Sequence, residues 1–133
     1  MTVIDVEEGT SAKFFEMEGG GRVQLRTISV ADFKAIQKQT VKKKVDFKRV
    51  DGIAGRFEYE AVDQDLQNEL YWDVVIVSWE GLTDKNGKDI PCTRENKTLL
   101  MTRSKKFLEF VVESLKTLAE DEASQEELVG KNS

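Results

Sequence analysis

The stretch YEAVDQDLQNELYWDVVIVSW, residues 59–79, decides the fold, because two interpretations of it lead to two architectures. Its apolar side chains recur every three or four residues, which is the spacing of one helix face. We therefore expect a central helix near residues 57–80. The four β-branched residues VVIV, at positions 74–77, leave a strand open as the alternative for that part.

The following segment, WEGLTDKNGKDIPCTRENKTLL at residues 79–100, contains the only proline and the only cysteine of the chain. Gly81 and Gly87 permit the positive φ angles of a helix end and of a tight turn. Pro91 favours extended backbone before it, and Thr93 is a good N-cap for a new helix. The segment is therefore predicted to connect two helices.

The N-terminal part has the pattern of a β-hairpin followed by a helix. Within KFFEMEGGGRVQLRTIS, residues 13–29, two short runs of strand character flank three consecutive glycines. Alternating polar and apolar residues beside a glycine-rich turn predict a hairpin. Ser29 is then expected to cap a helix whose apolar face contains Phe33 and Ile36.

A basic segment lies between this helix and the central one. Its members are Lys42, Lys43, Lys44, Lys48 and Arg49. Such a cluster suits either an acidic partner or a solvated strand edge, where lysines discourage pairing with other strands. We favour the edge. The sequence VDGIAG, residues 50–55, is expected to be a flexible connection.

The last helix is predicted by one apolar stripe and spans residues near 104–119. The stripe consists of Phe107, Val111, Leu115 and Leu118. Residues 120–133 are acidic and lose the stripe, so a frayed helix or a disordered tail is expected there. Residues 1–12 are expected to be a flexible arm, which leaves residues 13–119 as a single compact domain. The predicted fold class is α+β, mainly α: an N-terminal β-hairpin followed by a small helical bundle.

The composition argues against several kinds of chemistry. The 133 residues have a formal net charge of −5 and include no histidine and one cysteine, Cys92. Histidine is the commonest general base and metal ligand, and it is also the usual partner that activates a cysteine nucleophile. Cys92 therefore lacks that partner. The acidic turn at Asp84 lacks the glycine and the fifth-position ligand of a calcium loop. We expect no enzyme activity, no cofactor and no metal, and a cytoplasmic protein without a membrane span of roughly 20 apolar residues.

Three segments occur in a distinctive order: VQLR at Val23–Arg26, the stretch Leu70–Lys97, and the helix Phe107–Leu118 before an acidic tail. In this order they resemble the tail assembly chaperones of long-tailed bacteriophages and prophages. The resemblance implies a protein that binds and solubilises the tape-measure protein, helps to recruit tail-tube subunits, associates with itself and is absent from the mature virion. It also implies a short product beside a longer frameshifted one, and Gly130-Lys131-Asn132 is a segment that a slippery codon run can encode.

A partner-binding surface is the expected site, since no catalytic group is recognisable. The candidate residues are Trp72, Trp79, Asp84, Asn86, Ile90 and Pro91. Tryptophan is a good interface anchor, although both tryptophans are equally well explained as core residues. Two other functions stay open: a minor structural or tail-completion protein of the virion, and a small nucleic-acid-binding regulator that uses the patch from Lys42 to Arg49. The negative net charge argues against nucleic-acid and membrane partners.

Overall fold

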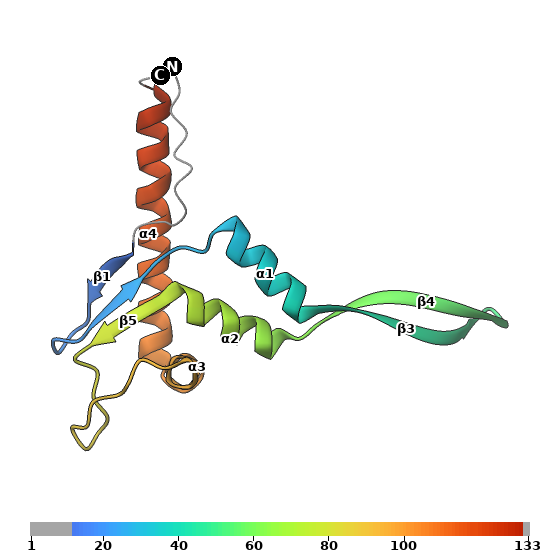
Figure 1. Ribbon diagram of the computed structural model, residues 1–133, viewed down its shortest axis with the longest axis horizontal. Coiled ribbons are helices and arrows are strands. Elements are labelled where there is room, and N and C mark those ends of the chain that lie inside the picture. Colours follow the sequence, from blue (N-terminus) through green and yellow to red (C-terminus); the bar gives the residue numbers. More distant parts are fainter. Residues whose placement is uncertain (1–11, 132–133) are drawn as a thin grey trace.

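A computed structural model describes residues 12–131, with side-chain surroundings for residues 12–123 (Figure 1). Its elements are, in chain order, β1 Lys13–Glu16, β2 Arg22–Leu25, α1 Val30–Thr40, β3 Val41–Val50, β4 Ile53–Val62, α2 Gln64–Val75, β5 Ile76–Glu80, α3 Arg94–Arg103 and α4 Lys105–Lys131. The expected α+β class, mainly α and beginning with a β-hairpin, is confirmed. The expected flexible arm lies, except for residue 12, outside the described residues.

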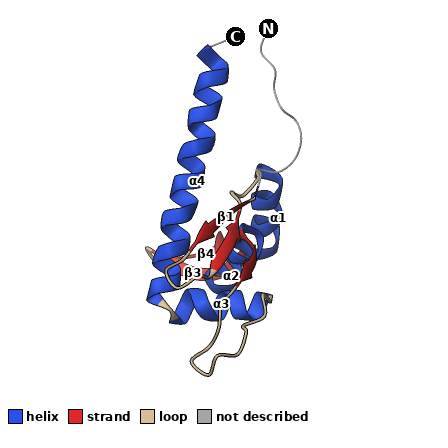
Figure 2. Ribbon diagram, turned by 90° about the vertical axis from the view of Figure 1, so that its left-hand side faces the viewer, coloured by secondary structure: helices blue, strands red, loops and turns tan. Residues whose placement is uncertain are grey.

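The core lies between a three-stranded antiparallel sheet, in the order β1-β2-β5, and the helices α3 and α4. It consists of Val23, Leu25, Val75, Ile76, Trp79, Met101, Phe107 and Val111. Figure 1 shows α4 upright beside this sheet, and Figure 2 shows α3 lying across its lower end. Burying these side chains together removes apolar surface from water, which is the main stabilising term for a domain of this size.

The predicted N-terminal hairpin is confirmed, with Phe15 of β1 opposite Val23 of β2. Gly19 and Gly20 both have positive φ angles, which glycine adopts without a steric penalty. Gly21 is closely packed: a Cβ atom there would lie 2.8 Å from a methyl carbon of Leu82 and 3.2 Å from the carbonyl oxygen of Gly81. The turn therefore packs directly on the chain that follows β5.

The predicted central helix near residues 57–80 is wrong in extent. Its first part belongs to β4, its middle forms α2, and its last part forms β5. Asp63 separates β4 from α2, because its carboxylate accepts a hydrogen bond from the backbone N–H of Leu66 and caps the helix. The strand alternative at residues 74–77 is correct from Ile76 onward, where β5 pairs with β2.

β3 and β4 form a two-stranded antiparallel hairpin that extends away from the body (Figure 1). We call residues 41–62 the projecting hairpin. Only Asp51 and Gly52 form its turn, and both have positive φ angles, as a tight two-residue turn requires. The expected flexible connection at residues 50–55 is therefore wrong, because all but these two residues of that segment belong to strands. The expectation that the lysines lie on a strand edge is confirmed.

The projecting hairpin follows α1 and precedes α2 in the chain, and these two helices pack against each other. The predicted cap of α1 is confirmed, since Ser29 Oγ accepts a hydrogen bond from the N–H of Asp32. At the base, the N–H of Asp63 donates to the carbonyl oxygen of Thr40 at 2.8 Å. The buried Thr40 hydroxyl donates to the carbonyl oxygen of Ile36 at 2.7 Å. The first bond holds the two ends of the hairpin together, and the second lies within the last turn of α1.

Helix α4 continues to Lys131, well beyond the expected end near residue 119. Residues 119–129 include neither glycine nor proline and are rich in good helix formers, so nothing in the sequence stops the helix. The acidic segment is partly fixed to the body, because Thr27 Oγ1 donates to a carboxylate oxygen of Glu122 at 2.9 Å. The acidic charge of the C-terminal segment is thus carried on a helix as far as Lys131.

Candidate functional site

Trp79, a predicted partner-binding residue, lies in the core and is 7% exposed. Its indole Nε1 donates a 2.7 Å hydrogen bond to the carbonyl oxygen of Ile90. Its ring meets Phe107 edge-on, with 5.9 Å between the ring centroids. Trp72 is half-buried and packs against the same core. The interpretation of Trp79 as a core residue is therefore the one that describes the structure.

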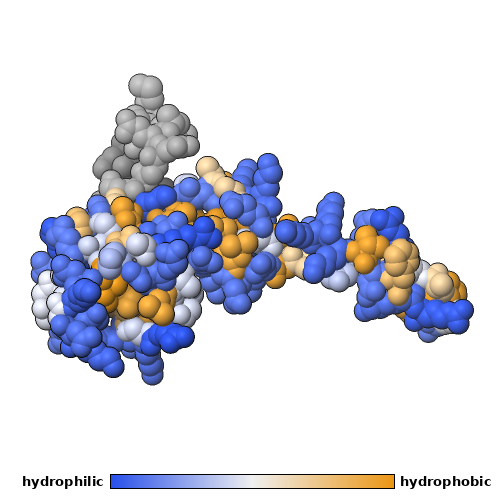
Figure 3. All heavy atoms as spheres, turned by 60° about the horizontal axis from the view of Figure 1, so that its bottom comes forward, coloured by the Kyte–Doolittle hydropathy of each residue, from blue (hydrophilic) through white to orange (hydrophobic). Residues whose placement is uncertain are grey.

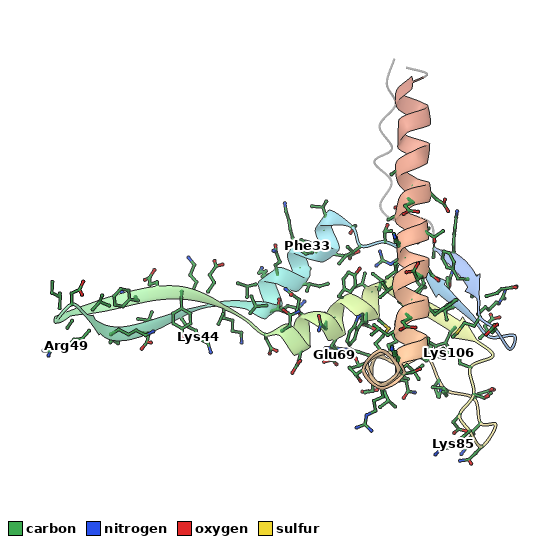
Figure 4. All side chains as sticks on the ribbon, turned by 180° about the vertical axis from the view of Figure 1, so that it is seen from behind. Phe33, Lys44, Arg49, Glu69, Lys85 and Lys106 are labelled. Atoms are coloured by element: carbon green, nitrogen blue, oxygen red, sulfur yellow. The ribbon has the colours of Figure 1, made fainter. Side chains whose placement is uncertain are left out.

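The predicted turn between β5 and α3 is exposed, and Figure 4 shows Lys85 at its tip. Asp84 Oδ1 accepts hydrogen bonds from the N–H groups of Asn86 and Lys88, at 2.8 and 3.0 Å. Asp84, Asn86 and Pro91 lie on this exposed segment, whereas Ile90 is half-buried against the core. The Asp84 carboxylate thus shapes the turn, and of the other candidates only Asn86 and Pro91 are exposed.

Cys92 is a free, half-buried thiol. Burial raises its pKa, although the nearby Lys97 ammonium opposes that effect. The thiol is therefore held in its protonated form, which is a poor nucleophile. Lys97 itself is buried, and its Nζ donates to the carboxylate and to the carbonyl oxygen of Asp73, at 3.0 and 3.2 Å. This ion pair joins α3 to α2 and has a structural role.

Two further findings concern only the described part of the chain. There, His, Cys, Asp and Glu side chains form no group of three that could hold a metal ion. No helix between residues 12 and 131 is both long enough and apolar enough to cross a membrane.

The projecting hairpin carries the most exposed apolar side chains of the described residues (Figure 3). Phe47 and Ile53 are 77% and 73% exposed. The other exposed apolar residues of the hairpin are Val45, Val50, Phe57, Tyr59 and Val62. A cluster of exposed apolar side chains is typical of a surface that contacts a partner.

Strand register assigns these side chains to two faces, because residues that pair across the strands share a face. One face, the aromatic face, contains Val50, Ile53, Phe57 and Tyr59 together with Lys42, Lys44, Asp46 and Lys48. The opposite face contains Val45 and Phe47 together with Lys43, Arg49, Arg56, Glu58 and Glu60. Both faces therefore mix apolar and charged groups.

The predicted basic patch is divided by this alternation. Lys42, Lys44 and Lys48 lie on the aromatic face, whereas Lys43 and Arg49 lie on the other one, and acidic residues of both strands lie among them. Figure 4 shows Lys44 midway along the hairpin and Arg49 near its far end. The five basic side chains therefore do not form one continuous stripe for a phosphate backbone.

Two features of the sequence predict the projecting hairpin, although the interpretation of residues 57–80 as one helix does not use them. Arg56-Phe57-Glu58-Tyr59-Glu60 alternates strictly between charged and aromatic residues, as a two-sided strand does. Asp51-Gly52 is a preferred pair for a two-residue hairpin turn. Taken together, these two features predict a hairpin centred on Asp51-Gly52.

A family model described as YdaY prophage protein matches residues 29–132, which include α1, the projecting hairpin and every element that follows them. The chain belongs to this family. It is therefore a prophage protein, and the matched region contains the whole candidate surface. Comparisons with curated proteins and with solved structures give no match.

Proposed function

We propose that this member of the YdaY family is a tail assembly chaperone. It binds and solubilises the tape-measure protein in the host cytoplasm, helps to recruit tail-tube subunits, and leaves before the virion matures. It acts by binding, not by catalysis. The observation that supports this role best is the projecting hairpin, with its apolar side chains exposed among charged ones.

A chaperone that holds a client needs accessible apolar surface and enough charge to keep the complex in solution. The projecting hairpin has both, since Phe47 and Ile53 are largely exposed and six basic and four acidic residues lie between positions 41 and 62. Its distance from the core is useful as well (Figure 1), because a client can contact it without disturbing the packed body.

The prophage family and the order of the three segments in the sequence add further support. The segment Leu70–Lys97, which carries most of the resemblance to tail assembly chaperones, contains parts of α2, all of β5 and the exposed turn. A longer frameshifted product is part of the same proposal, and the codons for residues 130–132 test it directly.

Co-expression with the tape-measure gene of the same prophage tests the proposal. We expect the chain to raise the soluble fraction of the tape-measure protein and to co-purify with it. The double substitution Phe47→Ser/Ile53→Ser is expected to abolish both effects. The matched control is Val30→Ser on α1, because Val30 is 72% exposed but lies outside the hairpin.

Two outcomes would contradict the proposal. The first is an insoluble tape-measure protein whether or not the chain is present, although the chain itself is soluble and folded. The second is stoichiometric chain in purified mature virions, measured by mass spectrometry, which would favour a minor structural tail protein instead.

A further inference from the structure

The projecting hairpin has two long unpaired edges. β3 and β4 form a sheet of only two strands, each ten residues long, and no other strand of the described residues pairs with them. An isolated two-stranded sheet is marginally stable in water, and unpaired edges are templates for another chain. Both edges of the hairpin therefore leave backbone groups available to a further strand.

The turn determines which backbone groups of β4 are available. Val50 and Ile53 close the two-residue turn as a hydrogen-bonded pair, and such pairs recur at every second position of an antiparallel ladder. Phe57 thus directs its N–H and C=O groups towards β3. Arg56 and Glu58, on either side of it, direct theirs outward to the free edge.

The outer edge of β4 is complementary to itself. When two β4 strands run antiparallel with Phe57 opposite Phe57, Arg56 of each strand lies opposite Glu58 of the other. Both of these pairs are hydrogen-bonded pairs that use outward-facing backbone groups, and both join opposite charges. We propose that two copies of the chain pair along their β4 edges in this register and form a four-stranded antiparallel sheet.

The aromatic face supports the same register. Phe57 and its counterpart form a non-hydrogen-bonded pair, in which side chains come closest and aromatic pairs are favourable. Tyr59 of one copy lies opposite Gly55 of the other, which has no side chain of its own. The Phe57 ring already lies beside Gly55, since a Cβ atom on Gly55 would be 3.3 Å from Cε2 of that ring. The interface thus places four aromatic rings together.

The outer edge of β3 is unsuited to the same pairing. Centred on Asp46, two antiparallel β3 strands place Lys44 opposite Lys48 twice and Lys43 opposite Arg49 twice. Centred on Val45, they place Lys42 opposite Lys48 twice, which cancels the two attractive pairs of Lys44 with Asp46. Like charges that face each other across strands are destabilising. In the four-stranded sheet β3 forms both outer edges, where its lysines prevent further strands from adding.

Charge exchange tests the register in the full-length chain. The substitutions Arg56→Glu and Glu58→Arg each replace two attractive pairs between the copies by two repulsive ones, and each also breaks the 3.4 Å ion pair between Arg56 and Glu58 of one chain. Each alone is expected to raise the dissociation constant of the dimer by roughly tenfold or more. The double substitution Arg56→Glu/Glu58→Arg and an equimolar mixture of the two single variants both restore opposite charges, so both are expected to dimerise. Mass is measured by sedimentation equilibrium over a range of concentrations.

The mixture is the decisive measurement, since a variant that merely unfolds does not regain a partner on mixing. A wild-type chain that stays monomeric at all concentrations overturns the proposal, as does a mixture that stays monomeric. A mass that grows without limit also overturns it, because it indicates head-to-tail pairing of β3 on β4. Circular dichroism of each variant confirms that it is folded.

Cross-linking gives an independent readout of the two-fold axis. In a non-hydrogen-bonded pair the Cα atoms lie about 4.5 Å apart, within the range that a disulfide spans. Phe57→Cys in a Cys92→Ser background is expected to form a covalent dimer with oxidised glutathione. Phe47→Cys, exposed on β3, is the matched control and is expected to remain monomeric. Equal cross-linking of the two variants overturns the register.

This inference does not rest on the proposed chaperone role. The mass and cross-linking measurements use the chain alone, whereas the chaperone test measures the solubility of the tape-measure protein. A negative result in the dimer experiments does not contradict the chaperone role, and a negative result in the solubility experiment does not contradict the dimer.

Discussion

The indole of Trp79 on β5 donates a hydrogen bond to the carbonyl oxygen of Ile90, eleven residues later, at 2.7 Å. The bond spans the exposed turn and fixes the start of the segment that leads into α3. An interaction of this kind, made by a buried donor, contributes about 1 kcal/mol and costs about 1–3 kcal/mol when one partner is left unsatisfied.

Trp79→Phe is therefore expected to lower the free energy of unfolding by about 1–3 kcal/mol, because it keeps a ring near Phe107 but removes the donor. Urea denaturation followed by circular dichroism measures this change. Val30→Ala, which shortens an exposed side chain on α1, is the control and is expected to change stability by less than about 0.5 kcal/mol. An equal loss in the two variants would show that the Trp79 hydrogen bond contributes nothing specific.

Two glycines of the segment between β5 and α3, Gly81 and Gly87, are expected to differ in how much they contribute to thermal stability. Gly81 and Gly87 both have positive φ angles, so alanine at either position is strained by about 1–2 kcal/mol. At Gly81 the added Cβ atom would also lie 3.3 Å from the Cα atom of Gly21, whereas it would meet nothing at Gly87. We expect Gly81→Ala to lower the melting temperature more than Gly87→Ala. The opposite order would be evidence against close packing between the two turns.

Asp32 provides a pH-dependent contribution to stability. The hydrogen bond from the Ser29 hydroxyl, at 2.8 Å, is the largest cause that lowers its pKa from the ordinary 3.8, and Arg26 lowers it further. Because the folded-state pKa is lowered, the contribution is present above pH 3.8 and is lost as the pH falls through the folded-state value.

Ser29→Ala is expected to move the Asp32 pKa back towards its ordinary value. NMR titration of the side-chain carboxyl carbon measures the shift. The loss of stability on acidification should be smaller in Asp32→Asn than in the wild-type chain over the same pH range. An unchanged Asp32 pKa in Ser29→Ala would assign the effect to Arg26 instead.

The core is expected to fold without most of the projecting hairpin, since no member of the core cluster belongs to it. Replacing residues 45–58 by Asp-Gly joins Lys44 to Tyr59 and keeps the pairs at the base of the hairpin. We expect the near-ultraviolet circular dichroism of the buried Trp79 to be retained and the melting temperature to change by only a few degrees. Loss of that signal would mean that the hairpin stabilises the body after all.

Local chemistry made part of this fold predictable. The caps at Ser29 and Thr93 and the glycine turn of the first hairpin follow from side-chain hydrogen bonds and φ preferences that act over a few residues. The sequence periodicity from Tyr59 to Val77 was misleading, because three elements in succession happened to place apolar residues at helical spacing. The pairing of β4 with β3, the cap at Asp63 and the pairing of Ile76 with Leu25 of β2 separate them.

The candidate surface was harder to predict than the core. Residue type alone makes Trp79 a candidate interface residue, but its burial depends on Phe107 and Ile90, which are distant in sequence. Exposure of Phe47 and Ile53 depends on the hairpin extending away from the body. That direction is set by how α1 and α2 pack, which no local pattern encodes.

The connections at the base of the projecting hairpin have a mechanical consequence. α1 passes into β3 without a loop, a single residue separates β4 from α2, and α2 passes directly into β5. A load applied at the tip therefore acts through a lever whose fulcrum is the contact between α1 and α2. Because no loop interrupts this path, a force that bends the tip is transmitted through α1 and α2 to the three-stranded sheet.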